Sequence, residues 1–457
     1  MPDPLSYIDR ESERFREELF EFLRIPSISA RSEHDADTRR AAEWLLTHLR
    51  NAGVDAALAE TPRHPAVIAR WTDAPHAPTV LVYGHYDVQP AEPLDEWSSA
   101  PFEPEVRDGR IRARGAADDK SQVFLQVKAL EALLATRGTL PLNVTLVLEG
   151  EEEIGSPDLV PLIQARRHEL AADHVVISDS MMFGPGQPSL IFAMRGLAYF
   201  ELDAEIGSHD LHSGQYGGAV ANPANALAAV IASMHDAVGH VAVPGFYDDV
   251  APVDDTLRAR FRALPFDDAA YQRSAGGAEP VGEAGYTTVE RLWTRPTLDV
   301  NGLVSGYTGE GAKTVLPARA RAKLSCRLVA GQDPARVGER LRAHVERVTP
   351  PGVRITVRQI QAARPWRSNT DNALYRAAGA ALEQTFGVPP VLAAHGGTLP
   401  IAPEFEDVLN ANVVVMGFAL PGANMHAPDE WFPEAHVGLG MKAMVRLYEQ
   451  LGGQAPS

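Results

Sequence analysis

The feature that most constrains the fold is an alternation of short apolar runs and longer amphipathic runs over the first 180 residues. "TVLVYGH" (79–85), "NVTLVLEG" (143–150) and "HVVISD" (174–179) have the composition of buried strands, and helix-like segments follow the first two, at 121–135 and 157–170. Strands that alternate with helices build a parallel sheet covered by helices. We therefore predict an α/β fold whose main domain is a helix-covered, mostly parallel sheet, preceded by an amphipathic helix over 7–23.

The pattern changes near residue 196, which indicates a second domain. "LAYFELDAEIG" (197–207) alternates as an exposed-face strand, Asn222 and Pro223 have the capping pattern of a helix start, and residues 240–300 are aperiodic and rich in Pro, Gly and Asp. A further strand over 320–331 precedes a helix over 335–348. We predict a smaller α+β domain inserted into the first, with the main domain at 1–195 and 364–457 and the insertion at 196–363.

Composition excludes several classes of function. The formal net charge of −18 opposes binding to nucleic acid or to an anionic membrane. No apolar run reaches the roughly 18 residues of a membrane helix, and the N-terminus has no secretory apolar region, so we predict a cytoplasmic protein. Cys326 is the only cysteine, which rules out an intrachain disulfide and argues against a thiolate zinc site. Any metal must then be held by histidines and carboxylates.

Acidic and histidine residues follow the ends of the predicted strands, where open α/β sheets bind their ligands. They are His85, Asp118, the run Glu151–Glu152–Glu153, Asp179 and His426. Carboxylates gathered in one crevice repel one another unless a cation neutralises them. The ligand types suit zinc, manganese or cobalt better than calcium or magnesium. Their number predicts two divalent metal ions, with Asp118 as the bridging ligand.

Asp87 and one glutamate are left over from this ligand set. Asp87 is placed to accept the second imidazole N–H of His85 and so to fix its tautomer, although a turn residue is the alternative. A glutamate beside a ligating glutamate can act as a general base on the attacking water. Spacing alone does not say which member of the run 151–153 is the base and which is the ligand.

Several motifs resemble one known family along nearly the whole chain. They are "GHYDVQP", "GAADDKSQ", "EGEEEIGSPDL", "ISDS", "DLHSGQYGGAVANP" and "GAKTVLPARARAKLSCRL". They look like the co-catalytic metallopeptidase family of carnosinase, cytosolic nonspecific dipeptidase, carboxypeptidase G2 and acetylornithine deacetylase. The resemblance implies Glu152 as the base and Glu153 as a ligand. It also implies His85, Asp118 and Asp179 around one metal, Asp118, Glu153 and His426 around the other, and a cis peptide bond at Asp118–Asp119.

The same resemblance implies that the inserted domain is a lid that carries the contact of a homodimer. His212 in "DLHSGQYGG" matches a histidine that stabilises the oxyanion in the neighbouring subunit's active site. Arg327 matches an arginine that could clamp a substrate carboxylate, and a surface ion pair is the alternative. "GGTLP" (396–400) resembles a substrate loop, which makes Gly397 and Thr398 candidate contacts; a plain tight turn is the alternative.

Within this family the motifs are most similar to the dipeptidase branch. We therefore predict a dinuclear metallopeptidase that hydrolyses the amide bond of dipeptides, dipeptidase- or carboxypeptidase-like, through a metal-activated water and a glutamate base. His395 is a departure, because dipeptidases of this family usually have an acid directly before Gly-Gly that could meet a free amine. His395 is thus a candidate substrate contact, and an N-acyl or N-carbamoyl amino acid amidohydrolase is the alternative function. A metal-bound scaffold without activity is the third.

Overall fold

The structure is a computed structural model that describes residues 3–453 and forms two compact units. Unit 1 contains the described residues up to Phe192, Ser368–Ala393 and those from Ile401 onward. Unit 2 contains Ala193–Arg367 and Ala394–Pro400. Each unit has a hydrophobic core of its own.

Unit 1 is built on a mixed sheet whose four central strands are parallel, in the order β6-β3-β7-β17. The central strands are β3 (Thr79–His85), β6 (Asn143–Glu149), β7 (His174–Ile177) and β17 (Asn412–Val415). Antiparallel strands border them: β1 (Asp55–Ala59) and β2 (Ala66–Trp71) beside β6, and β8 (Ser189–Met194) beside β17. The predicted α/β fold with a mostly parallel central sheet is confirmed, because every apolar run named above forms a buried central strand.

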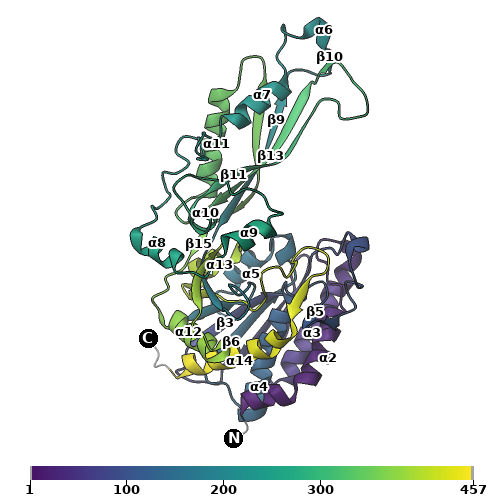
Figure 1. The fold of residues 1–457 in the computed structure, drawn as a ribbon. Coiled ribbons are helices and arrows are strands. Elements are labelled where there is room, and N and C mark those ends of the chain that lie inside the picture. Colours follow the sequence, from purple (N-terminus) through teal and green to yellow (C-terminus); the bar gives the residue numbers. More distant parts are fainter. Residues whose placement is uncertain (1–2, 454–457) are drawn as a thin grey trace. The chain divides into compact units, whose positions relative to one another are not determined.

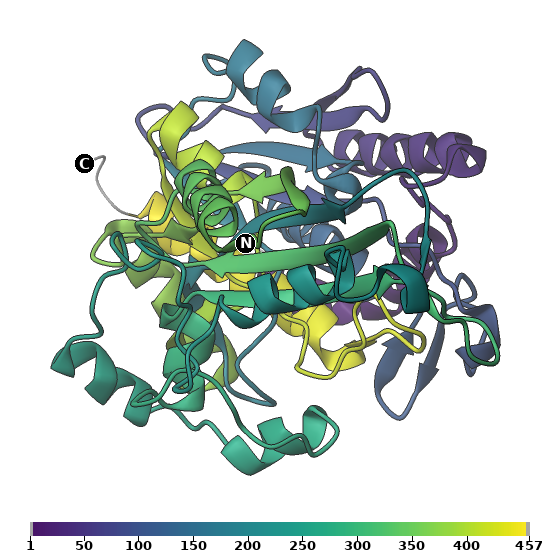
Figure 2. The same ribbon diagram turned by 90° about the horizontal axis from the view of Figure 1, so that it is seen from above.

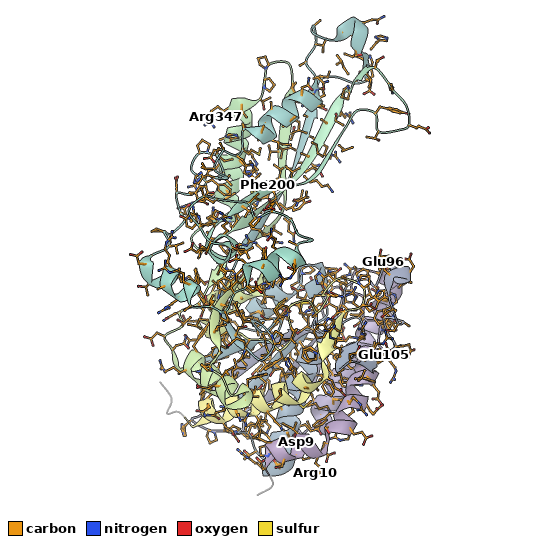
Figure 3. The ribbon with its side chains drawn as sticks, viewed as in Figure 1. Asp9, Arg10, Glu96, Glu105, Phe200 and Arg347 are labelled. Carbon is orange, nitrogen blue, oxygen red and sulfur yellow. The ribbon has the colours of Figure 1, made fainter. Side chains whose placement is uncertain are left out.

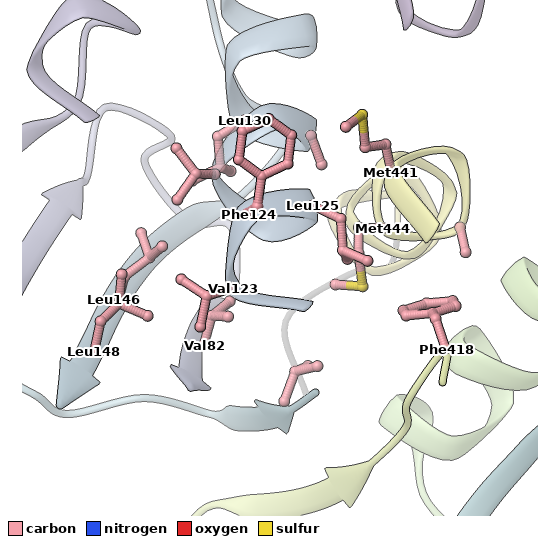
Figure 4. Close-up of a cluster of buried hydrophobic side chains, with 14 of the residues drawn as sticks. Val82, Val123, Phe124, Leu125, Leu130, Leu146, Leu148, Phe418, Met441 and Met444 are labelled. Carbon is pink, nitrogen blue, oxygen red and sulfur yellow. The ribbon is translucent and has the colours of Figure 1, made fainter. Parts of the chain in front are cut away.

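Helix α4 (Lys120–Arg137) is buried on nearly all sides, and it lies against β3 and the C-terminal helix α14 (Glu434–Gly452) (Figure 1). Figure 4 shows Phe124 and Leu125 of α4 between Leu146 of β6 and Met441 of α14. Several polar residues of α4 are buried and have hydrogen-bond partners: Gln122 donates to the carbonyl of Ala117 and accepts from the amide of Phe418. This side chain therefore ties the loop before α4 to the segment after β17.

Three sequence predictions differ from the structure at helix boundaries. The helix predicted over 7–23 is two helices, α1 (Pro4–Arg10) and α2 (Ser12–Leu23), which break at Glu11. The helix predicted from Pro157 begins two residues later, as α5 (Leu159–Ala165). The segment 240–300 holds three short helices, because Asp254, Asp267 and Thr287 each cap one. The three short helices start at side-chain caps, which periodicity does not report, whereas α2 and α5 start without a side-chain cap hydrogen bond.

Unit 2 contains a four-stranded antiparallel sheet in the order β11-β13-β9-β14, seen from a second direction in Figure 2. Its strands are β9 (Gly196–Glu205), β11 (Thr297–Ser305), β13 (Arg319–Leu328) and β14 (Arg354–Ala363). Helices α7 (Pro223–Ala232) and α11 (Pro334–Val348) pack on one face around Phe200, while Arg347 lies on the outer side of α11 (Figure 3). The start of α7 is as predicted, with Asn222 as cap and Pro223 in the first turn.

The remaining elements are short or peripheral. The helices are α3 (Asp35–Asn51), α6 (Ser213–Tyr216), α8 (Asp255–Arg262), α9 (Asp268–Ser274), α10 (Thr288–Thr294), α12 (Ala373–Phe386), α13 (Ile401–Leu409) and the 3-10 turns η1 (Ser32–His34), η2 (Leu94–Glu96) and η3 (Glu152–Ile154). The strands are β4 (Glu105–Arg107), β5 (Arg110–Arg112), β10 (Leu211–His212), β12 (Val315–Leu316), β15 (Trp366–Arg367), β16 (Val391–His395) and β18 (Trp431–Pro433). Within residues 3–453, no helix is long and apolar enough to cross a membrane.

Candidate metal centre and active site

The parallel register of unit 1 brings the predicted ligands to one edge of its sheet. Strand β3 ends at His85, which pairs with Glu149 at the end of β6, and β7 ends two residues before Asp179. The result is two groups of side chains that share Asp118. The first is His85, Asp118 and Asp179, the second is Asp118, Glu153 and His426, and within each group the ligand atoms lie within 4.8 Å of one another.

Asp118 lies between the two histidines and directs one carboxylate oxygen at each. Its Oδ1 is 3.0 Å from Nε2 of His85, and its Oδ2 is 2.9 Å from Nε2 of His426. The outer carboxylates complete the two groups, with Asp179 3.9 Å from His85 and Glu153 3.3 Å from His426. This is the arrangement expected of a bridging carboxylate with one histidine and one further acid on each side. The Asp118–Asp119 peptide bond is cis, which confirms that prediction.

The electrostatics of the cluster favour a bound cation. Burial, together with the negative charge of Asp118, raises the pKa of Asp179 to about 7. Burial and the same neighbouring charge also raise the pKa of Glu153. A pKa raised in this way means that the carboxylate form is destabilised by lost hydration and by like charge. Nitrogen and carboxylate donors fit zinc, manganese or cobalt, and divalent ions would relieve this repulsion.

Glu152 lies in the same acidic cluster but belongs to neither ligand group. It begins the turn η3, which also carries Glu153. Burial raises the pKa of Glu152 well above its usual value, and the charges of Asp179, Glu153 and Asp118 raise it further. A carboxyl group that lies beside the two ligand groups without belonging to either is a candidate for a general base.

Asp87 connects the first ligand to this turn. Nδ1 of His85 lies 3.1 Å from the Asp87 carbonyl and 3.3 Å from its carboxylate, so the imidazole N–H is directed at Asp87 and Nε2 is left for the metal group. The same carboxylate accepts hydrogen bonds from the backbone amides of Glu152 (3.2 Å) and Glu153 (3.1 Å). Asp87 is therefore positioned to orient His85. It also holds the turn that carries the two glutamates, and this second contact was not predicted from the sequence.

Glu430 is a buried residue of the site that the sequence reasoning missed. Its Oε1 accepts from the amides of Ala117 (2.7 Å) and Asp118 (3.0 Å), and its Oε2 accepts from the amide of Gly115 (2.9 Å) and from Arg114 (2.8 Å). Burial raises the pKa of Glu430 to about 7, whereas these donors stabilise its carboxylate form. Glu430 thus holds the loop that presents Asp118. An acid four residues after His426 was the only available signal.

Two further side chains that were not predicted support the glutamate turn. Gln89 donates from Nε2 to the carboxylate of Glu153 at 2.7 Å, which fixes the direction of that ligand. The buried carboxyl of Glu149 accepts from the hydroxyls of Tyr83 (2.5 Å) and Ser156 (2.8 Å), and Ser156 follows the turn with a φ of +51°. Partners that orient a metal ligand are part of such a site's design. Each of them lies in a motif quoted above, but only the fold shows its contact.

The predicted substrate contacts Arg327, His395, Gly397 and Thr398 all lie in unit 2. Nη1 of Arg327 donates to the Thr398 hydroxyl at 2.8 Å, and Nδ1 of His395 accepts from the amide of Gly397 at 3.0 Å. Among the residues that the structure describes, the Arg327 side chain makes no ion pair. His212 ends β10, is exposed, and accepts from the amide of Gly214 through Nδ1 at 3.0 Å.

Comparisons with known proteins agree with this site. The model of peptidase family M20/M25/M40 matches residues 81–450. The Beta-Ala-His dipeptidase of Rattus norvegicus is 30% identical over 99% of this chain and 96% of its own length, and the Cys-Gly metallodipeptidase DUG1 of Saccharomyces cerevisiae is 28% identical over 98% and 97%.

Two solved structures are similar over nearly all of both chains. Human carnosine dipeptidase 1 has a TM-score of 0.86 at 28% identity and covers 99% of this chain and 98% of its own. The M20 family metallo-carboxypeptidase Sso-CP2 of Sulfolobus solfataricus has a TM-score of 0.85 at 32% identity and covers 96% and 99%. The resemblance drawn from the motifs, and its direction toward dipeptidases, are confirmed. The chain therefore belongs to peptidase family M20/M25/M40 and is a metal-dependent peptide hydrolase.

Proposed function

We propose that this protein is a dipeptidase that holds two divalent metal ions and uses Glu152 as its general base. The observation that carries the proposal is the pair of ligand groups that share Asp118, with the half-buried Glu152 in the same acidic cluster that belongs to neither. The names of its relatives support the substrate class, since they include a Beta-Ala-His dipeptidase and a Cys-Gly metallodipeptidase.

In this proposal His85, Asp118 and Asp179 hold one metal ion, and Asp118, Glu153 and His426 hold the other. When bound, the ions supply Lewis acidity, which polarises the scissile carbonyl and lowers the pKa of water. The donor set supports zinc or manganese, with cobalt as a possible substitute in vitro. Asp87, Glu430 and Gln89 keep the ligands in position through the hydrogen bonds described above.

Glu152 performs the proton transfers in this proposal. Its carboxylate accepts a proton from the attacking water as the water adds to the carbonyl carbon. The same group then gives the proton to the nitrogen of the leaving amine, so that the carboxylate is restored after each turnover. The place of Glu152 next to Glu153 in the turn η3 supports both steps, because a general base must lie within reach of the water whose proton it accepts.

Unit 2 supplies substrate recognition and the dimer contact in this proposal. Arg327 and Thr398 together offer donors to the terminal carboxylate of a dipeptide. His212 is exposed on unit 2 and its Nε2 is free to donate to an oxyanion, which supports a role in the active site of a partner subunit. We therefore propose a homodimer, located in the cytoplasm.

An amidohydrolase acting on N-acyl or N-carbamoyl amino acids is the second candidate function. The observation that favours it is His395, because an imidazole beside two arginines cannot form an ion pair with the free amine of a dipeptide. This candidate shares the metal centre and the base with the dipeptidase and differs in the group on the acyl side. An inactive scaffold, the third alternative, does not account for a buried base beside a complete set of ligands.

The test is hydrolysis by the metal-loaded protein before and after removal of its metals. We expect cleavage of a mixed panel of dipeptides, loss of activity with a chelator, and recovery with manganese, zinc or cobalt. A parallel panel of N-acetyl and N-carbamoyl amino acids decides between the first two functions. Activity that survives exhaustive chelation would contradict the metal proposal, and cleavage of the acylated panel alone would favour the amidohydrolase.

A further inference from the structure

Unit 2 contains a cluster of positive and hydrogen-bond-donating groups around His395. Arg195, at the end of β8, donates from Nε to the carbonyl of Gly396 at 3.1 Å and from its backbone amide to the carbonyl of His395 at 3.3 Å. A Cβ on Gly396 would lie 3.0 Å from Nη2 of Arg195, so the glycine allows the guanidinium to lie against the backbone. Arg327 approaches the same loop through Thr398. All these residues belong to unit 2.

The donors of this cluster are largely unused. Among residues 3–453, Arg195 makes no ion pair, and its only side-chain hydrogen bond is through Nε, which leaves both terminal nitrogens available. Nδ1 of His395 accepts from Gly397, so the proton of the neutral imidazole is on Nε2, which is a further donor. The charge of Asp299 acts on both arginines, but its carboxylate accepts a hydrogen bond from the Thr297 hydroxyl and makes no ion pair with either among the described residues.

The cluster is also electrostatically strained. Burial, together with the positive charge of Arg327, lowers the pKa of Arg195 to about 10. Burial and both arginines lower the pKa of His395. Cations that lose hydration and repel one another are stabilised by an anion, as clustered carboxylates are by a metal. A planar guanidinium with two free nitrogens fits a carboxylate through paired hydrogen bonds.

We propose that Arg195 and His395 form a second anion-binding site, which takes a side-chain carboxylate of the substrate, while Arg327 and Thr398 take its terminal carboxylate. The inference rests on the proposed dipeptidase function, and it names the substrate class as acidic dipeptides. Both groups that surround the second site donate hydrogen bonds, so an amide side chain of the same size can satisfy only part of them. The site therefore discriminates glutamate from glutamine by charge.

The experiment compares dipeptides that differ only in this charge. kcat/KM is measured for Glu-Ala against Gln-Ala and for Ala-Glu against Ala-Gln, with the metal-loaded wild type, Arg195→Gln, His395→Gln and Arg321→Gln. We expect the wild type to prefer glutamate in at least one position. The Arg195→Gln variant should lower that preference by about tenfold or more, the scale of a lost charged hydrogen bond. Arg321 lies exposed on β13, pairs with Asp203, and is the matched control that should leave the preference unchanged.

A binding measurement separates this inference from the proposed function. Thermal unfolding of the metal-loaded protein is followed with glutarate and with glutaramide, which has the same size without the charges. We expect glutarate alone to raise Tm, and the rise to shrink in Arg195→Gln and in Arg195→Lys, which lacks the planar fork. Hydrolysis of dipeptides without a glutamate preference would overturn the inference and leave the function standing. A glutarate effect that depends on Arg195 without dipeptide hydrolysis would support the site and overturn the function.

Discussion

The acidic cluster of unit 1 and the basic cluster of unit 2 are built on the same principle with opposite charge. In unit 1, carboxylates around Asp118 are buried together, and burial and mutual repulsion raise the pKa of Asp179 to about 7. In unit 2, burial and repulsion lower the pKa of Arg195 to about 10. Each arrangement is unfavourable without a ligand of the opposite charge. The sign of the clustered charge therefore indicates the class of ligand, a cation in unit 1 and an anion in unit 2.

The two clusters differ in how firmly the fold holds them. Most candidate ligands of unit 1 follow central strands, whereas Asp118 lies just before α4 and is held through its two histidines and through Glu430. In unit 2 the loop 394–400 supplies His395 and Thr398, and its residues are mostly only half-buried. Removing one group from a buried site with many hydrogen bonds should cost much binding free energy. In a half-buried site solvent screens the charges, so the same change should cost less. We expect the sizes of mutational effects to follow this order.

The largest expected effect is on the base of unit 1. Glu152→Gln should lower kcat by about a hundredfold to ten-thousandfold, because the proton acceptor is lost, while metal content measured by elemental analysis stays at the wild-type level. Glu153→Gln is the matched control and should lose metal. If Glu152→Gln emptied the site and Glu153→Gln left it full, the two roles within the glutamate run would be exchanged.

The next effect tests whether unit 2 of one subunit serves the metal centre of another. His212→Ala should lower kcat by about a hundredfold, the scale of a lost oxyanion donor. When His212→Ala and Glu152→Ala proteins are dissociated and reassembled together, half of the dimers are mixed and each contains one intact site. Activity should then return to about a quarter of wild type if the dimer is two-fold symmetric. No recovery, with reassembly confirmed by size, would place His212 outside the partner's site.

A smaller effect is expected for the support of the bridging ligand. Glu430→Gln retains the shape of the side chain but loses the charge that four donors share, so metal affinity should fall by about ten- to a hundredfold. Calorimetric titration of the metal-free protein with zinc or manganese measures the metal affinity directly. Glu434→Gln is the control, since Glu434 lies at the start of α14 and only approaches Arg16 at 3.7 Å. Equal affinity in both variants would show that Glu430 serves folding alone.

The smallest expected effect is the dependence on salt concentration, which should differ between the two clusters. Raising sodium chloride from low to physiological ionic strength and beyond should increase KM for Glu-containing dipeptides by a few fold, because a half-exposed cationic site is screened. Metal content, measured on the same samples, should not change. If the KM values for Glu and Gln dipeptides rose in parallel, the basic cluster would not bind the side-chain carboxylate of glutamate.

Much of unit 1 could be predicted because its signals are local in the sequence. The run "TVLVYGH" is mostly apolar because β3 is buried on both faces, and His85 is its last residue, where the strand reaches the sheet edge. Such a pattern places a residue at a strand end without any knowledge of tertiary contacts. Helix boundaries were predicted less well: α5 begins two residues after Pro157, and the three capped helices of 240–300 were not predicted.

The sequence by itself therefore determined the α/β class, the candidate ligands from His85 to His426, and the family. These features could be predicted because strand periodicity and motif spacing depend on residues that are close together in the sequence. The tertiary structure decided which side chains support those ligands and which charges gather elsewhere. Glu430 meets the loop 114–118 across more than 300 residues, and Arg195 meets the carbonyl of Gly396 across about 200. Hydrogen bonds and Coulomb interactions act over a few ångströms in space and are blind to sequence separation, so only the folded chain reveals them.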